Sequence, residues 1–335
     1  MLDAIRPPEM VREVNRLRIR DRNRLRQGKA EFIYVNCPAC GRSGNGPQEW
    51  DACGFTYDKC ASCGTVYMNP RPTRTQLVRY LRESEAYQYW AIELFPATEE
   101  ARYKYIALPR AHLVVRWWRT TTGEKEGRLN PQSLLDVGAG IGTFCRAIRK
   151  TSLSTTLFAV EPVTALANAC RDAGVGTFYN TVEEQEGFVI PFDVVTMWEV
   201  IEHVHDPALV LQKCRRWMRP DGLLFLTCPN VDSLEIMLLG REAPMVTHDH
   251  LNCFTPDAVA SLLERSGFTV LDMTTPGKLD VELVQRAIRD GSIHSRKLGV
   301  FLPHVLSDDR LASSFQRWLV RARLSSHLQV VARRD

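Results

Sequence analysis

One stretch decides the fold: Leu134-Leu135-Asp136-Val137-Gly138-Ala139-Gly140-Ile141-Gly142-Thr143-Phe144. Its first residues predict a short buried strand, and the alternate glycines predict a tight turn into a helix that starts near Cys145. Glycines let the backbone approach a ligand, and the free N–H groups of a helix start favour a carboxylate or phosphate. A dinucleotide fingerprint would need glycine where Thr143 stands, which argues against hydride transfer. A purely structural glycine turn is the plainer alternative.

This pattern resembles motif I of the class I S-adenosylmethionine (SAM) methyltransferases, in which an acid precedes G-x-G-x-G. In that family the turn holds the methionyl part of SAM. The resemblance implies that Asp136, Gly138, Gly140 and Gly142 surround the methionyl end here, and that SAM is the cofactor.

A second predicted strand supplies the acid that a nucleoside ribose needs. Residues 157–160 are apolar and lead into Glu161, about 20 residues past the glycines, which is the offset expected of a ribose-binding carboxylate. Later strand ends are expected to complete the cofactor site, with Asn180, Thr181 and Val182 bordering the adenine and the apolar Met197 and Trp198 lining the methyl-transfer site.

From residue 134 onward, predicted strands alternate with helices, which favours an α/β fold with a doubly wound, Rossmann-like sheet. Later strands are expected over 175–179, 192–197, 222–227, 268–273 and 327–332, and the methyltransferase resemblance implies that the last is antiparallel. We divide the chain into a basic arm (1–30), a zinc ribbon (31–72), a helical cap and linker (73–128), the SAM-binding core (129–275), and a helical excursion with the final strand (276–335).

Two C-x-x-C-G knuckles precede the core. Cys37, Cys40, Cys60 and Cys63 have the spacing of a tetrahedral structural Zn²⁺ site, and the glycine after each pair lets amide N–H groups point at the thiolates. Cys53 is expected to be a bystander, because four ligands are already present. The ribbon has few basic side chains, which favours a scaffold or substrate-lid role over nucleic-acid binding.

Length and composition set the outer limits. A chain of 335 residues with 44% apolar content suits a folded enzyme with an accessory module. It has no run of 18 apolar residues and no apolar signal-peptide core, so we expect no membrane span and a cytoplasmic location. Residues 1–30 carry nine basic side chains against four acidic ones. Such an arm can bind phosphate, but its loose apolar spacing favours a solvated helix with outward arginines.

Candidate catalytic residues follow the fourth predicted strand. If a helix starts near Glu199, then Glu199, Glu202 and His203 share one face, and a histidine-rich loop farther on adds His250. The glutamates can also merely complement the helix N-terminus.

The sequence around and after the fourth predicted strand resembles the ubiquinone-pathway O-methyltransferases. It also resembles the metal site of terminal small-RNA 2′-O-methyltransferases, in which two glutamates and two histidines hold a divalent ion. The second resemblance implies that Glu199, Glu202, His203 and His250 bind Mg²⁺, Mn²⁺ or another divalent ion that grips adjacent acceptor hydroxyls. Without a metal, His203 or His250 is the candidate general base.

The whole layout resembles bacterial methyltransferases of sugar and polysaccharide biosynthesis, because a zinc ribbon precedes the SAM domain and the histidine loop. We therefore expect a small-molecule or saccharide acceptor that is methylated on a hydroxyl, with Asn230 and the 234–239 helix in its pocket. C-methylation of a nucleotide sugar is one alternative. An RNA-binding or RNA 2′-O-methylating protein is another, against which the weakly basic ribbon counts.

Overall fold

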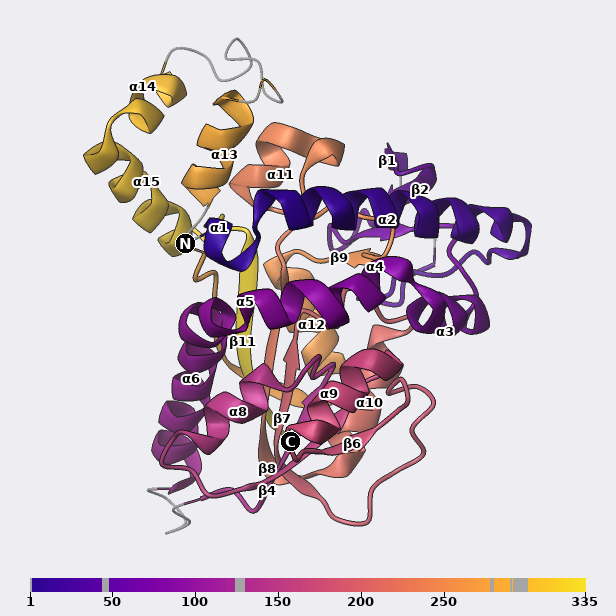
Figure 1. The fold of residues 1–335 in the computed structure, drawn as a ribbon, viewed down its shortest axis with the longest axis vertical. Coiled ribbons are helices and arrows are strands. Elements are labelled where there is room, and N and C mark those ends of the chain that lie inside the picture. The colour runs from indigo at the N-terminus through magenta and orange to yellow at the C-terminus, as the bar shows by residue number, and fades with distance from the viewer. Residues whose placement is uncertain (1, 44–47, 124–129, 278–279, 290, 292–300) are drawn as a thin grey trace.

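The computed structural model describes residues 2–43, 48–123, 130–277, 280–289, 291 and 301–335 (Figure 1). This part of the chain forms two β-sheets surrounded by helices. A seven-stranded sheet has the order β10-β11-β8-β7-β4-β5-β6, and a four-stranded sheet has the order β1-β2-β3-β9.

The seven-stranded sheet is the doubly wound sheet that the sequence predicts. Parallel pairing joins β4, β5, β6, β7 and β8, whereas β11 is antiparallel to both β8 and β10. The α/β fold class is thus confirmed. The strands are β4 (Ser133–Val137), β5 (Thr156–Val160), β6 (Gly176–Phe178), β7 (Phe192–Trp198), β8 (Met218–Pro229), β10 (Phe268–Thr274) and β11 (His327–Arg334).

Helices cover both faces of this sheet, which explains why its central strands are apolar throughout. On one face, Trp118 and Phe144 pack with the strand residues Leu134 and Phe225. On the other, Val210 and Leu262 pack with Val195. The first face is covered by α6 (Leu108–Trp118) and α8 (Thr143–Arg149), the second by α10 (Pro207–Trp217) and α12 (Pro256–Arg265), and α9 (Thr164–Asp172) follows β5.

The cysteine module is joined to the core by a shared sheet. Its strands β1 (Gln48–Ala52), β2 (Phe55–Lys59) and β3 (Val66–Met68) form an antiparallel sheet, and β9 (Asn252–Cys253) extends it from the far half of the chain. Arg71 reinforces this joint. Its buried guanidinium donates to the carbonyl oxygens of Met68, His205 and Leu251 and to the Asn252 side chain. The cysteine module and the core therefore stabilise each other's folded structure.

Replacing Arg71 with methionine is expected to lower the free energy of unfolding by about 3 kcal/mol, because several buried carbonyl oxygens lose their donor. Denaturant unfolding followed by circular dichroism measures this change. Arg74→Met is the control, since Arg74 is exposed on the next helix. An Arg71→Met protein as stable as that control would contradict the joining role.

The N-terminal arm is packed against the protein. It contains α1 (Leu2–Ile5), α2 (Pro8–Gln27) and η1 (Lys29–Glu31), and Figure 1 shows α2 running alongside the row of helices labelled α5 (Phe95–Arg102) and α4 (Glu85–Tyr89). Val14, Leu17 and Leu25 are buried on its inner face. The buried Asp21 accepts hydrogen bonds from the Glu85 and Ala86 amides, at the start of the cap helix that begins at Glu85. The prediction of a solvated helix with outward arginines was wrong for this inner face.

The cap comprises α3 (Arg74–Glu83), α4 (Glu85–Tyr89), η2 (Trp90–Leu94), α5 (Phe95–Arg102), η3 (Tyr103–Ala107), α6 and η4 (Arg119–Gly123). Thr73 and Gln76 form a capping box that starts α3. The cap covers the glycine turn, because a Cβ on Gly140 would lie 3.8 Å from the Phe95 ring. Residues 124–128 of the expected cap and linker, and residue 129 of the expected core, lie outside the described residues.

The expected helical excursion contains α13 (Asp280–Arg289), α14 (Phe301–Ser307) and α15 (Asp309–Arg321). Val284 and Leu319 bury their side chains there, together with Leu234 of α11 (Leu234–Leu239), which runs into η5 (Gly240–Glu242). In the described parts of the chain, no helix combines the length and apolar character needed to cross a membrane.

Candidate functional site

The glycine turn has the backbone that only glycine adopts easily. Gly138, Gly140 and Gly142 have φ values of 70°, 56° and 80°, in the left-handed region. A Cβ on Gly138 would also lie 2.4 Å from a methyl carbon of Val200. The turn that the sequence predicts is therefore present, and Gly142 leads directly into α8.

Glu161 lies at the end of β5 beside this turn. Its carboxylate accepts hydrogen bonds from the Gly140 amide at 2.9 Å and the Val163 amide at 3.0 Å. Burial raises its pKa to about 7. The structure thus brings Glu161 to the glycines, as expected, and each carboxylate oxygen keeps a further lone pair for a ribose hydroxyl.

Four residues expected around the cofactor lie in the protein core instead. Asp136 is buried and accepts a hydrogen bond from Thr196 at 2.6 Å, and burial raises its pKa to about 7. Met197 is fully buried, whereas Trp198 faces the opposite side of β7 and packs edge-on against Phe144. Neighbouring strand residues point to opposite faces, so Met197 and Trp198 do not line one wall. Val182 is buried in the core as well.

The residues expected near the adenine follow β6. Asn180 is partly exposed, and its amide donates to Gln185 at 3.0 Å. Thr181 is nearly buried and forms a local turn with Glu184. Asn180 therefore remains the residue of this group that is open to a ligand. The predicted place of Asn230 in an acceptor pocket was wrong, because its buried amide donates to the Arg323 and Ser325 carbonyls.

The predicted helix starting near Glu199 was also wrong. Residue 199 has a positive φ of 59°, and the chain turns there before α10 begins at Pro207. The helix starts late because Asp206 caps it and proline favours the first helical position. As a result Glu199 does not share a helix face with Glu202 and His203.

Glu199 forms a separate charged group. Its carboxylate lies 3.3 Å from His327 Nε2 and 3.3 Å from Arg110 Nη2, and Arg110 also donates to Thr227 at 3.2 Å. Although burial opposes it, His327 and Arg110 lower the pKa of Glu199. The sequence gives no signal for His327, which reaches this position only through the pairing of β11 with β8.

Glu202, His203 and His250 form the second group. One ligand atom from each lies within 4.8 Å of the others. Glu202 is buried, and neither of its oxygens has a hydrogen-bond partner among the described residues. Burial and the nearby Glu199 raise its pKa well above the usual range.

Both histidines can offer a lone pair to a cation. His203 Nδ1 lies 2.8 Å from the Asp249 carbonyl oxygen, which can only accept, so Nδ1 carries the proton and Nε2 is a lone-pair donor. Burial lowers the pKa of His250 to about 3, and its Nδ1 has no partner in the described chain. A buried carboxylate without a hydrogen-bond partner, beside two imidazoles that can each present a ring nitrogen, fits a divalent cation.

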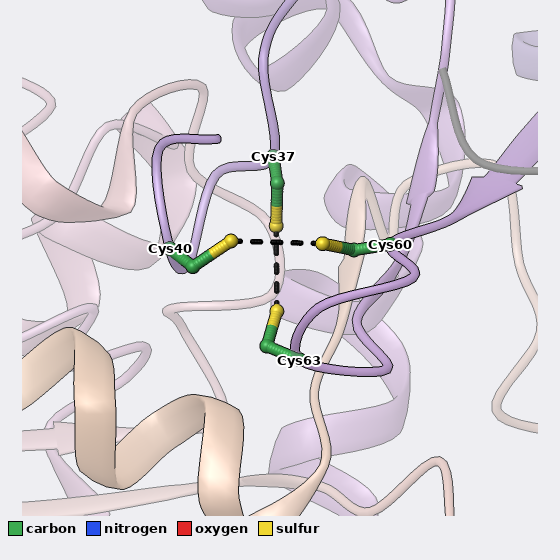
Figure 2. Close-up of side chains that lie close together, drawn as sticks. All are labelled: Cys37, Cys40, Cys60 and Cys63. Carbon is green, nitrogen blue, oxygen red and sulfur yellow. Dashed lines mark hydrogen bonds between the residues drawn. The ribbon is translucent and has the colours of Figure 1, made fainter. Parts of the chain in front are cut away.

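The four predicted cysteines converge from two loops (Figure 2). The sulfur atoms of Cys37 and Cys63 lie 3.5 Å apart, and those of Cys40 and Cys60 lie 3.6 Å apart. Four thiols at these separations fit the corners of a tetrahedral zinc site, in which sulfurs about 2.3 Å from the ion lie under 4 Å apart. Cys53 is outside the group and approaches the Val246 carbonyl, as a bystander would.

Comparison with known proteins supports the catalytic core. A family model described as a methyltransferase domain matches residues 111–273. The ubiquinone biosynthesis O-methyltransferase of Colwellia psychrerythraea is 30% identical over 151 residues, which cover 42% of this chain and 61% of that protein. The corresponding protein of Aeromonas salmonicida is 30% identical over 163 residues, covering 45% of this chain and 68% of that one.

Among solved structures, the plantazolicin methyltransferase BpumL in complex with SAH aligns with a TM-score of 0.47 and 15% identity, over 74% of this chain and 93% of that one. The sequence relatives, the matched domain and the observed glycine turn agree. The chain belongs to the class I SAM-dependent methyltransferases.

Proposed function

We propose that this protein transfers a methyl group from SAM to a hydroxyl oxygen of a sugar or other polyhydroxyl acceptor, with a divalent cation held by Glu202, His203 and His250. The buried, unpartnered Glu202 carboxylate facing two imidazoles carries the proposal. Oxygen as the acceptor atom is supported by the relatives, which are named as O-methyltransferases. Glu199, which the sequence predicts as a fourth ligand, is left out because Arg110 and His327 hold it.

A bound divalent cation lowers the pKa of an alcohol, so that its oxygen can attack the sulfonium methyl group. The chain's own residues prepare the site. The Asp249 carbonyl orients the His203 ring, and burial keeps His250 neutral. Three protein ligands leave positions open for the acceptor, as catalytic metal sites require.

We further infer that the four cysteines hold a structural Zn²⁺ and that the ribbon positions the histidine loop. Tyr57 of β2 donates to the carbonyl oxygens of Thr247 and His250, at 3.1 Å and 3.4 Å. The β3–β9 pairing starts two residues after His250. These contacts favour a scaffold role for the ribbon, because they fix the backbone of a proposed ligand.

The test is metal analysis of the purified protein, combined with calorimetric titration of SAM and Mn²⁺ before and after mild chelation. We expect one tightly bound zinc, SAM binding, and a second Mn²⁺ site that Glu202→Gln removes. SAM binding without a second metal site would contradict the proposed divalent-cation site. A histidine acting as general base would then be the remaining mechanism. Loss of SAM binding altogether would contradict the methyl-transfer proposal.

Replacing Glu161 with alanine is expected to weaken SAM binding at least about 100-fold, because it removes the ribose acceptor and the hydrogen bond that holds the Gly140 amide. Calorimetry with SAM measures the loss. Glu186→Ala is the control, since Glu186 is exposed. Unchanged SAM affinity in Glu161→Ala would exclude the ribose role.

A further inference from the structure

Two arginines from distant parts of the chain meet near the glycine turn, on the side that Phe95 covers. Arg6 lies in the bend between α1 and α2, and Arg102 ends α5. The Arg102 guanidinium donates from Nη2 to the carbonyl oxygen of Ile5 at 3.1 Å, which places it next to Arg6. Arg6 is exposed and Arg102 is partly exposed, so both remain open to a ligand.

The Arg102 side chain is held in place by its neighbours, yet one nitrogen of its guanidinium keeps its N–H donors free. Its Nε donates to Thr98 at 2.9 Å, and its guanidinium lies 4.6 Å from the ring centre of Phe95 and 5.6 Å from that of Trp90. No residue of the described chain accepts from Nη1, so both N–H bonds of that nitrogen can bind a ligand. Phe95 in turn lies over the glycine turn at Gly140, which puts Arg102 within reach of a molecule bound beside SAM.

Arg6 and Arg102 have no ion-pair partner among the described residues, although the carboxylates of Glu199 and Glu235 lie close enough to attract the charge of Arg6. Among the described residues, no carboxylate lies within 4 Å of the Arg6 or Arg102 guanidinium, and Glu199 is already held by Arg110 and His327. Burial and the neighbouring Arg6 and Arg110 lower the pKa of Arg102 to about 9. Bound SAM, with a sulfonium, an ammonium and one carboxylate, would add a further positive charge.

We propose that Arg6 and Arg102 form a subsite for a phosphate or diphosphate group carried by the acceptor. The proposal rests on the methyl-transfer function proposed above and narrows its substrate to a phosphorylated polyhydroxyl compound. A guanidinium binds phosphate oxygens through paired, charge-assisted hydrogen bonds, and two such groups match a dianion. The N-terminal arm thereby becomes part of the substrate site.

The structure shows how the arm presents Arg6. Asp21 caps the start of α4, and Arg18 lies 3.7 Å from the Asp249 carboxylate in the histidine loop. Both contacts tie α2 to elements that flank the site. Arg18 is therefore a positioning residue paired with an acid, whereas Arg6 and Arg102 are the unpaired cations that face the ligand.

The experiment titrates inorganic diphosphate into the full-length protein saturated with SAH, by calorimetry, with no added divalent ion. We expect saturable binding that weakens at least tenfold in Arg6→Gln and in Arg102→Gln, while the Kd for SAH changes less than twofold. Arg102→Lys keeps the charge and is expected to retain more affinity than Arg102→Gln. Arg12→Gln, an exposed change on the same arm, is the control and should bind as the unmodified protein does.

Other outcomes would overturn the subsite. If diphosphate does not bind, or binds equally to all variants, the arginines do not form it. If Arg6→Gln or Arg102→Gln weakens SAH binding tenfold and diphosphate competes with SAH, the arginines hold the carboxylate of the cofactor. A protein that binds neither SAH nor SAM would contradict the proposed function itself, which is a separate result.

Discussion

Replacing His250 with alanine is expected to reduce methyl transfer at least about 100-fold while SAM affinity stays within about twofold. The half-buried imidazole lies against His203, with ring centres 4.7 Å apart, and its Nδ1 has no partner among the described residues. Removing it takes away either a cation ligand or the candidate base. The measurement is transfer from labelled SAM to a phosphorylated polyol, alongside calorimetry with SAM.

His112→Ala is the matched control, because His112 is exposed on α6 away from this group. Glu202→Gln should behave like His250→Ala and should also remove Mn²⁺ binding. Turnover that survives in both variants would exclude the Glu202–His203–His250 group from catalysis. Turnover lost only in His250→Ala would favour base catalysis over a cation.

Replacing Cys60 with serine is expected to abolish zinc binding and to lower the free energy of unfolding by about 4–5 kcal/mol or more, because loss of a structural metal is among the largest single-site effects. Because β3 pairs with β9 beside the histidine loop, the damage should also reach catalysis. Zinc content by elemental analysis and thermal unfolding measure the two effects.

Cys53→Ser provides the control within the same module, since Cys53 lies outside the four-sulfur group. It should keep one zinc per chain and nearly the original stability. A Cys60→Ser protein that retains zinc, or that loses zinc without losing stability, would contradict a structural site. The same zinc loss in Cys53→Ser would show that the ligand set is misassigned.

Local patterns predicted the fold well. The glycine turn, the ribose acid and the paired cysteine knuckles each depend on residues close together in sequence or on a fixed offset, and the structure brings each group together. The helical excursion and the antiparallel β11 followed from the alternation of strands and helices and from the family resemblance. The glycine turn, the ribose acid and the cysteine knuckles are encoded locally, so a single sequence was enough to place them.

The errors arose where packing overrides local spacing. Helical spacing placed Glu199 with Glu202 and His203, but the Asp206 cap starts the helix later, at Pro207. The two residues at the end of β7 point to opposite faces, so both could not line one wall. His327 and Arg6 reach the site from opposite ends of the sequence. Their positions depend on β-strand register and on the packing of α1 and α2, which no local pattern reveals.

The position of β11 in the sheet affects how the protein folds during its synthesis. This strand lies between β8 and β10, which precede it in the chain, and it begins with the residue that pairs with Glu199. During synthesis on the ribosome, the edges of β8 and β10 that face β11 therefore stay unpaired until β11 has emerged. Non-local pairing of this kind folds slowly and exposes strand edges. The nascent chain is thus expected to need a chaperone and to acquire activity only after β11 has inserted.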